Sequence, residues 1–537
     1  MAVISRRSFM VGASAAGLAF NQPAGTHSFS FANRVLQDQS GRPPERLITV
    51  FLRGGTDFLN LVVPGGGEDR GLYEQARPQL QIPATELLPL RDSIFGLHPS
   101  AAPLAELFDG GKLAVVLGAG LPADTRSHFD AQRFIEVGGV SNNAPRSGWL
   151  ARHLASAPPS VDGDAPLLPA LALGSNSPRS FATNNQVVAL PNLNGFEFPP
   201  EFGRWRAAQR TTMRRLYSSG DSAVNAAGIQ ALNGSNIIEL NSGGEYEPRS
   251  GVEYPSNQFG NGLAALARLI KLDLGLATAT IDLGGWDTHA NQGNGSGGFF
   301  SQLVATLAQG LRAFYADLDG PGDSNRINGT TVVVMSEFGR RLRENSGGTD
   351  HGHGGAMFVL GGSVNGGLHG SWPGLAKQNL YDQVDLSVTT DYRQVFSEIL
   401  IRKFANPRLG IVFPDYVDYE PLGLVTGDDL DPDYTLADAL DPTMIDDGDR
   451  DRGDDDVGDG QAASDPSNQN SAGDAPVGQA TGPAGSPSRG QSGDTSAFVV
   501  GGGVVAAVAL GALALRRRRP TNASRAELTD EDLRGPA

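Results

Sequence analysis

Leu47-Ile48-Thr49-Val50-Phe51-Leu52-Arg53-Gly54-Gly55-Thr56-Asp57 sets the architecture of this chain. Its first six residues are almost continuously apolar, which is typical of a strand that is buried on both faces of a parallel sheet. The two glycines then allow the backbone to turn tightly. The segment therefore predicts a buried strand with the Asp57 carboxylate directed off its carboxyl end.

Similar apolar runs alternate with amphipathic segments up to about Leu424. The further strands that we expect are Leu113–Leu117, Ala277–Leu283, Thr330–Met335 and Ala356–Leu360. The helices that we expect are Ala101–Phe108, His128–Val137, Pro200–Ser218, Phe259–Leu274, Phe300–Leu318 and Tyr392–Phe404. Apolar strands separated by helices predict an α/β domain over residues 44–424, with a mostly parallel central sheet and helices on both faces.

The composition limits the chemistry that is open to this domain. The chain has a net charge of −17 and no cysteine. Most of the negative charge lies between Asp428 and Asp494, so it says little about the ligand of the α/β domain. We expect no nucleic-acid partner. Without thiolates, any metal ion must be bound by histidine and carboxylate side chains.

The N-terminus carries the pattern of a bacterial export signal. Ser5-Arg6-Arg7-Ser8-Phe9-Met10 contains paired arginines, and a short apolar stretch of small residues follows from Val11 to Phe20. This order of charged and apolar regions predicts a twin-arginine signal within residues 1–30. The stretch is too short to span a bilayer. We therefore expect the twin-arginine translocase to be a partner during export.

Residues 425–496 form an acidic segment rich in Asp, Gly, Ser, Pro and Gln. Such a composition cannot bury enough apolar surface to fold, and it predicts an extended, disordered linker. Asp447, Asp449 and Asp451 alternate like the start of a calcium-binding loop. However, the glycine comes one position late, at Gly453, and no glutamate closes the loop. A solvated linker is the favoured interpretation.

Ala497–Leu515 is an uncharged apolar run that reaches roughly 28 Å as a helix, about the thickness of the hydrocarbon core. Arg516-Arg517-Arg518-Arg519 follows at once and predicts a cytoplasmic tail over residues 516–537. The expected protein is thus a single-pass protein of the cell membrane with its large domain outside the cytoplasm. Because Gly501-Gly502-Gly503 weakens the span, a cleaved sorting tail is the alternative.

Histidine and acidic residues gather after the predicted strands. Ligands of such sheets collect at the carboxyl ends of the strands. Imidazole with carboxylate suits Zn, Mn or Fe, whereas carboxylate alone suits Ca or Mg. We expect one or two divalent ions, of which Zn, Mn, Ca and Mg are the candidates, and the alternative is a hydrogen-bonded polar cluster. The candidate ligands are Asp57, Asp287, His289, Glu337, Asp350, His351 and His353.

Asp124-Thr125-Arg126-Ser127-His128-Phe129-Asp130-Ala131-Gln132 allows two interpretations of equal weight. In the first, Ser127 and Asp130 form a capping box that opens the next helix. In the second, the Ser127 hydroxyl lies in the positive potential of the helix N-terminus and is a nucleophile activated by a metal ion. Arg126 would then hold the oxygens of an anion, assisted by Arg340.

These segments together resemble the bacterial family called domain of unknown function 1501, a group of twin-arginine-exported proteins related to the alkaline phosphatase and sulfatase superfamily. The resemblance covers roughly Arg46 to Tyr416. It rests on five motifs in order: Phe51-Leu52-Arg53-Gly54-Gly55-Thr56-Asp57, Arg126-Ser127-His128-Phe129-Asp130-Ala131-Gln132, Gly285-Trp286-Asp287-Thr288-His289, Ser336-Glu337-Phe338-Gly339-Arg340 and Thr349-Asp350-His351-Gly352-His353-Gly354-Gly355.

The superfamily resemblance implies an alkaline-phosphatase-like fold and a set of roles. It implies a metal-binding aspartate after the first strand, which Asp57 matches, and a nucleophile at a helix start, which Ser127 matches in position. It also implies further ligands at late strand ends, for which the available residues are Asp287, His289, His351 and His353.

The sequence departs from the superfamily pattern in two places. Glu337-Phe338 stands where an Asp-His pair is usual, and Asp287 lies closer to His289 than the pattern has it. Both departures bear on the number of metal ions. The resulting hypothesis is a metal-dependent hydrolase of phosphate or sulfate esters that uses Ser127 as nucleophile. The rival hypothesis is a non-catalytic surface or binding protein built on a hydrolase-like fold.

Overall fold

The computed structural model describes residues 44–436 except for 159–167, 175–176, 185–186, 191–205, 221, 223, 226–227, 230, 235–245 and 294–296. The predicted signal region, most of the predicted linker, the predicted span and the tail lie outside these residues. Within the described part of the chain, no helix combines the length and the apolar character that crossing a membrane requires.

A nine-stranded sheet forms the centre of the molecule, in the order β13-β5-β12-β9-β1-β8-β6-β7, with β14 paired to β5. Its strands are β1 (Arg46–Leu52), β5 (Leu113–Gly120), β6 (Ala170–Leu173), β7 (Val187–Leu190), β8 (Thr278–Leu283), β9 (Thr330–Ser336), β12 (Gly355–Gly361), β13 (Gly367–Gly370) and β14 (Thr390–Asp391). β12 runs antiparallel to β5 and β9, and the other pairings in the described sheet are parallel. The sheet is therefore mixed but mostly parallel, as predicted.

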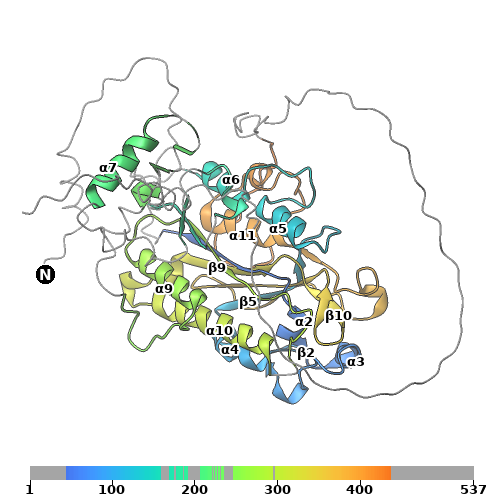
Figure 1. Ribbon diagram of the computed structural model, residues 1–537. Coiled ribbons are helices and arrows are strands. Elements are labelled where there is room, and N and C mark those ends of the chain that lie inside the picture. Colours follow the sequence, from blue (N-terminus) through green and yellow to red (C-terminus); the bar gives the residue numbers. More distant parts are fainter. Residues whose placement is uncertain are drawn as a thin grey trace, which may run out of the picture.

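Helices cover both faces of this sheet, which confirms the predicted layers (Figure 1). One face carries α4 (Ala102–Asp109), α9 (Gln258–Lys271) and α10 (Phe299–Leu318). The other carries α5 (His128–Glu136), α6 (Trp149–Ser156), α11 (Tyr392–Phe404) and α12 (Leu409–Val412). Of the helix predicted from Pro200, the structure describes α7 (Arg206–Tyr217).

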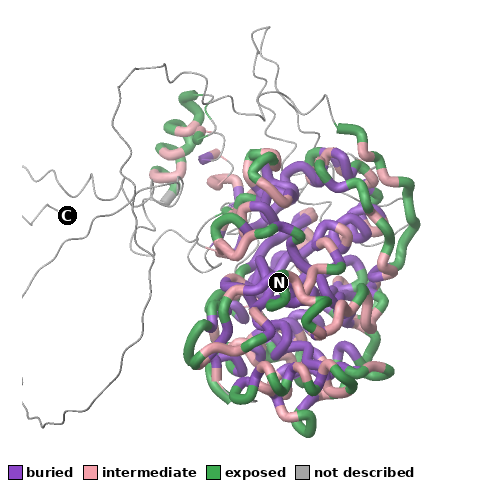
Figure 2. Tube along the Cα trace, turned by 90° about the vertical axis from the view of Figure 1, so that its right-hand side faces the viewer, coloured by how far each residue is buried: buried purple, intermediate pink, exposed green. Residues whose placement is uncertain are grey.

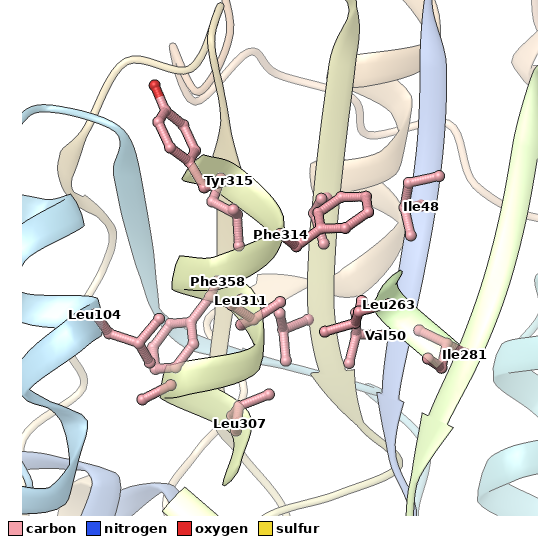
Figure 3. Packing of buried hydrophobic residues seen from close by; sticks show 14 of the residues in the cluster. Ile48, Val50, Leu104, Leu263, Ile281, Leu307, Leu311, Phe314, Tyr315 and Phe358 are labelled. Atoms are coloured by element: carbon pink, nitrogen blue, oxygen red, sulfur yellow. The ribbon is translucent and has the colours of Figure 1, made fainter. Parts of the chain in front are cut away.

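The core on the first face lies between the sheet and α10 (Figure 3). Ile48 and Val50 of β1 face Leu311 and Phe314 of α10, and Phe358 of β12 joins them. All five side chains are fully buried. Each buried side chain of this size contributes about 1.5–3 kcal/mol relative to an exposed one, so this layer fixes α10 against the sheet.

The alternate residues of β1 face the opposite layer. Leu47 and Phe51 belong to a second buried cluster that contains Phe396 of α11 and Ile135 of α5. Every residue of β1 is buried, which explains why Leu47–Leu52 is apolar except at Thr49. In Figure 2 the buried residues run through the middle of the domain, and exposed residues lie along its outer loops.

Smaller elements surround one end of the sheet. After β1 come α2 (Phe58–Leu61), β2 (Val62–Pro64) and α3 (Gly67–Ala76), and β2 pairs with β4 (Phe95–Leu97), which pairs with β3 (Leu88–Pro89). Between β9 and β12 lies a hairpin of β10 (Arg340–Glu344) and β11 (Thr349–His351). Because this excursion returns to the edge where β9 ended, β12 must run back antiparallel to β9.

The first residues of the predicted linker are described and contact the domain. Asp429 forms an ion pair with Arg402 of α11, at 2.9 Å. The Gly410 amide donates a 2.9 Å hydrogen bond to the Asp433 carbonyl. The described domain therefore continues through residue 436.

Candidate metal centre

The loops that carry the candidate ligands meet at one edge of the sheet. β1, β8 and β9 are parallel neighbours, so the turns after Leu52, Leu283 and Ser336 leave the sheet at the same edge. Since β12 is antiparallel, the segment that precedes Gly355 lies at this edge as well. The fifth contributor is the first residue of α5, His128.

Three imidazole rings converge on the Asp287 carboxylate. The Nε2 atoms of His289 and His351 each lie 3.1 Å from Asp287 Oδ1, and they lie 2.9 Å from each other. His128 Nε2 lies 3.5 Å from Asp287 Oδ2. Atoms of His128, Asp287 and His351 that can bind a metal ion all lie within 4.8 Å of one another.

The second nitrogen of each ring faces an oxygen that can only accept a hydrogen bond. His128 Nδ1 lies 2.8 Å from Glu337 Oε1, and His351 Nδ1 lies 2.8 Å from the carbonyl oxygen of Arg126. His289 Nδ1 lies 3.2 Å from Asp350 Oδ1. In the neutral tautomer with its hydrogen on Nδ1, each ring would turn an Nε2 lone pair toward Asp287, where it could bind a metal ion. Metal-binding histidines are held in this way by their outer nitrogen.

His128 shows most plainly that the group fits a metal ion. Its Nε2 atom is buried and has no hydrogen-bond partner among the described residues. A buried polar atom without a partner is costly unless a ligand satisfies it. The hydrogen bond from His128 to Glu337 raises the pKa of the ring.

Glu337 orients His128 and is fully occupied by hydrogen bonds. Its Oε1 atom accepts from His128, from Gln132 Nε2 at 2.8 Å and from the Gly54 amide at 2.9 Å. Its Oε2 atom accepts from Ser336 Oγ at 2.9 Å. Burial acts to raise the pKa of this carboxyl, but the hydrogen bonds lower it overall, so Glu337 is a carboxylate. The structure thus places Glu337 behind His128, one step away from the converging Nε2 atoms.

Arg340 fixes Asp287 and the loops around it. The Arg340 Nη2 atom lies 2.5 Å from Asp287 Oδ1. The remaining donors of this buried guanidinium bind the carbonyl oxygens of Gly54, Gly55, Trp286 and Thr349. Burial acts to raise the pKa of Asp287, but the Arg340 hydrogen bond and charge outweigh it and lower that pKa to about 2. Arg340 is therefore buried and paired with Asp287, and it holds the loops around that carboxylate.

Asp57 and His353 are not brought into this group. The Oδ2 atom of the fully buried Asp57 accepts from Arg77 Nη1 and Gln292 Nε2, both at 2.6 Å, whereas its Oδ1 atom has no hydrogen-bond partner among the described residues. The His353 ring stacks on Tyr381 with centroids 3.9 Å apart. Burial lowers the pKa of His353 to about 4, so this ring is neutral.

The segment before α5 is engaged within the protein. Ser127 caps the helix, and its Oγ atom accepts a 3.4 Å hydrogen bond from the Asp130 amide. The Arg126 side chain binds Asp385 at 2.6 Å and Asp382 at 2.9 Å. In the structure Ser127 is therefore the N-cap of α5, as the first interpretation predicted. The backbone carbonyl oxygen of Arg126 faces His351 Nδ1 and helps to orient that ring.

His128 was missed as a ligand in the sequence, although it lies within the Ser127 motif. The sequence did contain a sign of this role. His128 begins a helix that follows a predicted strand, and such a helix start lies at the edge of the sheet where the ligand-bearing loops also lie. Gln132 and Gln292 were missed as well. Their roles depend on contacts with residues that are distant in sequence.

The fold and these residues define an α/β protein with a candidate metal centre at the carboxyl edge of its sheet. A family model described as "Protein of unknown function (DUF1501)" matches residues 113–406. Because this match covers more than half of the chain, the protein belongs to the DUF1501 family. No curated protein matches the sequence.

Two solved structures show a distant likeness. Ps i-CgsB, crystallised in complex with k-i-k-neocarrahexaose, is 11% identical over 70% of this chain and 73% of its own, with a TM-score of 0.27. The alkaline phosphatase of Thermus thermophilus is 15% identical over 60% of this chain and 64% of its own, with a TM-score of 0.23. At these identities and TM-scores the two structures do not assign a function, so the function has to be inferred from the chemistry of the site.

Proposed function

We propose that the protein binds one divalent transition-metal ion through His128, Asp287 and His351, with His289 as a fourth ligand, and that it hydrolyses phosphate or sulfate esters there. One observation carries the proposal: three rings have their Nδ1 atoms bound to fixed acceptors and their Nε2 atoms turned toward one carboxylate. A merely structural polar cluster does not need three lone pairs directed at one point.

The ligand chemistry favours particular ions. Three imidazoles with one carboxylate suit Zn, Mn or Fe, whereas Ca and Mg prefer ligands that are all oxygen. We infer a single ion, because Asp57 is neutralised by Arg77 and Glu337 is occupied by four hydrogen bonds. Among the described residues, one group has the ligand geometry for a metal ion.

A bound ion would polarise an ester oxygen and stabilise the negative charge that develops in the transition state. In the proposed reaction, Ser127 Oγ forms a bond to phosphorus or sulfur while the bond to the alcohol oxygen breaks. The hydroxyl proton leaves with that alcohol, and water later releases the acid from Ser127. The N-terminus of α5 favours negative charge on Ser127 Oγ, which supports this role.

The charges around the site have a consequence for substrate binding. Arg126 is paired with Asp382 and Asp385, and Arg340 is paired with Asp287. Because carboxylates balance the charge of both arginines, we expect anion binding to depend mainly on the metal ion.

A second function, metal-dependent binding without catalysis, is favoured by one observation. Ser127 Oγ accepts a helix amide hydrogen, and the two nearby arginines are committed to carboxylates. A protein of this kind would hold a partner or polymer on the ion without attacking it.

From the sequence we also propose export by the twin-arginine translocase and anchoring in the cell membrane by residues 497–515, with residues 425–496 as the tether. Cell fractionation tests this. Replacement of Arg6 and Arg7 by lysine should keep the protein in the cytoplasm, and export of that variant would contradict the proposal.

The function is tested by metal analysis and an ester screen on the purified chain. We expect about one Zn or Mn per chain, loss of metal in His351→Ala, and retention in His369→Ala, whose ring binds the carbonyls of Asn365 and Leu422 instead. Ser127→Ala should keep the metal and lose hydrolysis of aryl phosphates or sulfates. Metal binding without turnover in the wild type would favour the binding function, and a protein that takes up no metal would refute both.

A further inference from the structure

We infer that Gln292 is a positioning residue that fixes the spacing of the two ligand-bearing loops, and this inference rests on the proposed metal centre. One loop carries Asp287 and His289 on either side of Thr288. The other carries Asp350 and His351 directly after Thr349. Gln292 touches both threonines and, behind them, Asp57.

The Gln292 amide joins three segments. Its Oε1 atom accepts hydrogen bonds from Thr288 Oγ1 and Thr349 Oγ1, each at 3.0 Å. Its Nε2 atom donates to Asp57 Oδ2 at 2.6 Å. The two loops also bond directly, because the Thr349 amide donates to the Thr288 carbonyl at 3.1 Å. The side-chain bonds thus extend a backbone contact that lies next to four of the candidate site residues.

The chemistry of the position calls for an amide. Gln292 is 1% exposed, Thr288 is 2% exposed, and Thr349 and Asp57 are fully buried. Two hydroxyls need an acceptor, and one carboxylate needs a donor, and the glutamine side chain supplies both. A glutamate would place its negative charge against Asp57. An apolar side chain would leave the hydroxyls without their partner, which is costly in the interior.

Asp57 is in turn held by Arg77, so the network has a rigid base. Arg77 Nη1 binds Asp57 Oδ2 at 2.6 Å and Asn60 Oδ1 at 2.7 Å. Its Nε and Nη2 atoms donate to the carbonyls of Leu342 and Arg341, each at 2.8 Å. The charge of Asp57 is thereby neutralised, and the turn after β1 is tied to the β10 strand. Asp57 acts here as an anchor for Gln292.

The test compares zinc affinity with the stability of the metal-free protein. Gln292→Met keeps the approximate volume and removes the amide. We expect the zinc dissociation constant, measured by competition with a chromophoric chelator, to rise about 10–100-fold, as when other groups behind metal ligands are lost. Thr349→Val is the milder second variant, and its effect should not add to that of Gln292→Met, because both remove the same bond.

Asn406→Ala is the matched control. Asn406 is also fully buried and binds His153 and Ser156, away from the metal group. The Asn406→Ala substitution should lower the melting temperature of the metal-free protein without changing the zinc dissociation constant. Unchanged zinc affinity in Gln292→Met, or equal weakening in Asn406→Ala, would overturn the positioning role alone. A wild-type chain that binds no zinc would instead overturn the proposed function.

Discussion

At the scale of single residues, Glu337 determines the state of the His128 ring. Its carboxylate is 2.8 Å from His128 Nδ1, and it keeps the hydrogen on that nitrogen. Glu337→Gln can still accept that hydrogen bond but loses the charge. We expect the zinc dissociation constant to rise about tenfold, with little change in the fold. Isothermal titration with zinc checks this, and an affinity equal to that of the wild type would count against the role of Glu337.

His153 makes the stability of the domain depend on pH. Burial lowers the pKa of His153 to about 3, from 6.5 in an unfolded chain. Between these values the unfolded state binds a proton that the folded state does not. Stability contributed by the neutral ring is therefore complete above pH 6.5 and is lost as the pH falls, by about 1.4 kcal/mol per pH unit.

Urea unfolding at pH 7 and pH 5 measures this effect. The wild type should lose more stability on acidification than His153→Gln, which cannot titrate. The same loss in both proteins would show that His153 is protonated in the folded state or contributes nothing. Since burial also lowers the pKa of His353, the variant should retain part of the pH dependence.

At the scale of elements, the turn after β1 must approach the Asp287 loop very closely. Gly54 has a φ of +122°, and a Cβ atom there would lie 2.4 Å from the Asp287 amide nitrogen. Gly54→Ala should therefore displace the loop that carries Asp287 and weaken zinc binding by at least tenfold, since ligand positions set the affinity.

Gly71→Ala is the control for this substitution. Gly71 lies within α3, where an added Cβ would meet nothing within 4 Å. It should leave zinc binding unchanged and stabilise the fold by about 0.4–1 kcal/mol. Chelator competition and thermal melting of the two variants give the comparison. Equal zinc affinity in Gly54→Ala and the wild type would refute the close approach.

The five adjacent strands β5, β12, β9, β1 and β8 and most of the helices that cover them could be predicted from the sequence, for a physical reason. Leu47–Leu52 is buried on both faces, and a strand in that environment is apolar at nearly every position. The amphipathic pattern of Phe300–Leu318 also predicted α10 correctly, because only one side of this helix contacts the sheet. The antiparallel direction of β12 could not be read from its apolar sequence. It follows from the β10–β11 excursion that brings the chain back to the same edge.

At the scale of the whole molecule, the sequence indicated the edge at which the site lies but not which residues meet there. Asp287, His289 and His351 converge as anticipated, whereas Asp57 is held by Arg77. Arg77 lies directly after α3, outside the five motifs. No pattern in the sequence indicates that it forms an ion pair with Asp57. The same applies to Glu337, whose burial and four hydrogen bonds turn an apparent ligand into a support for His128.

The most direct test of the metal centre is anomalous diffraction from crystals grown with zinc. We predict one strong peak per chain, about 2.0–2.1 Å from the Nε2 atoms of His128 and His351 and close to an Asp287 oxygen. The same peak should be lost in His351→Ala crystals. A map without a peak between these three residues, or with zinc bound at Asp57 instead, would contradict the account.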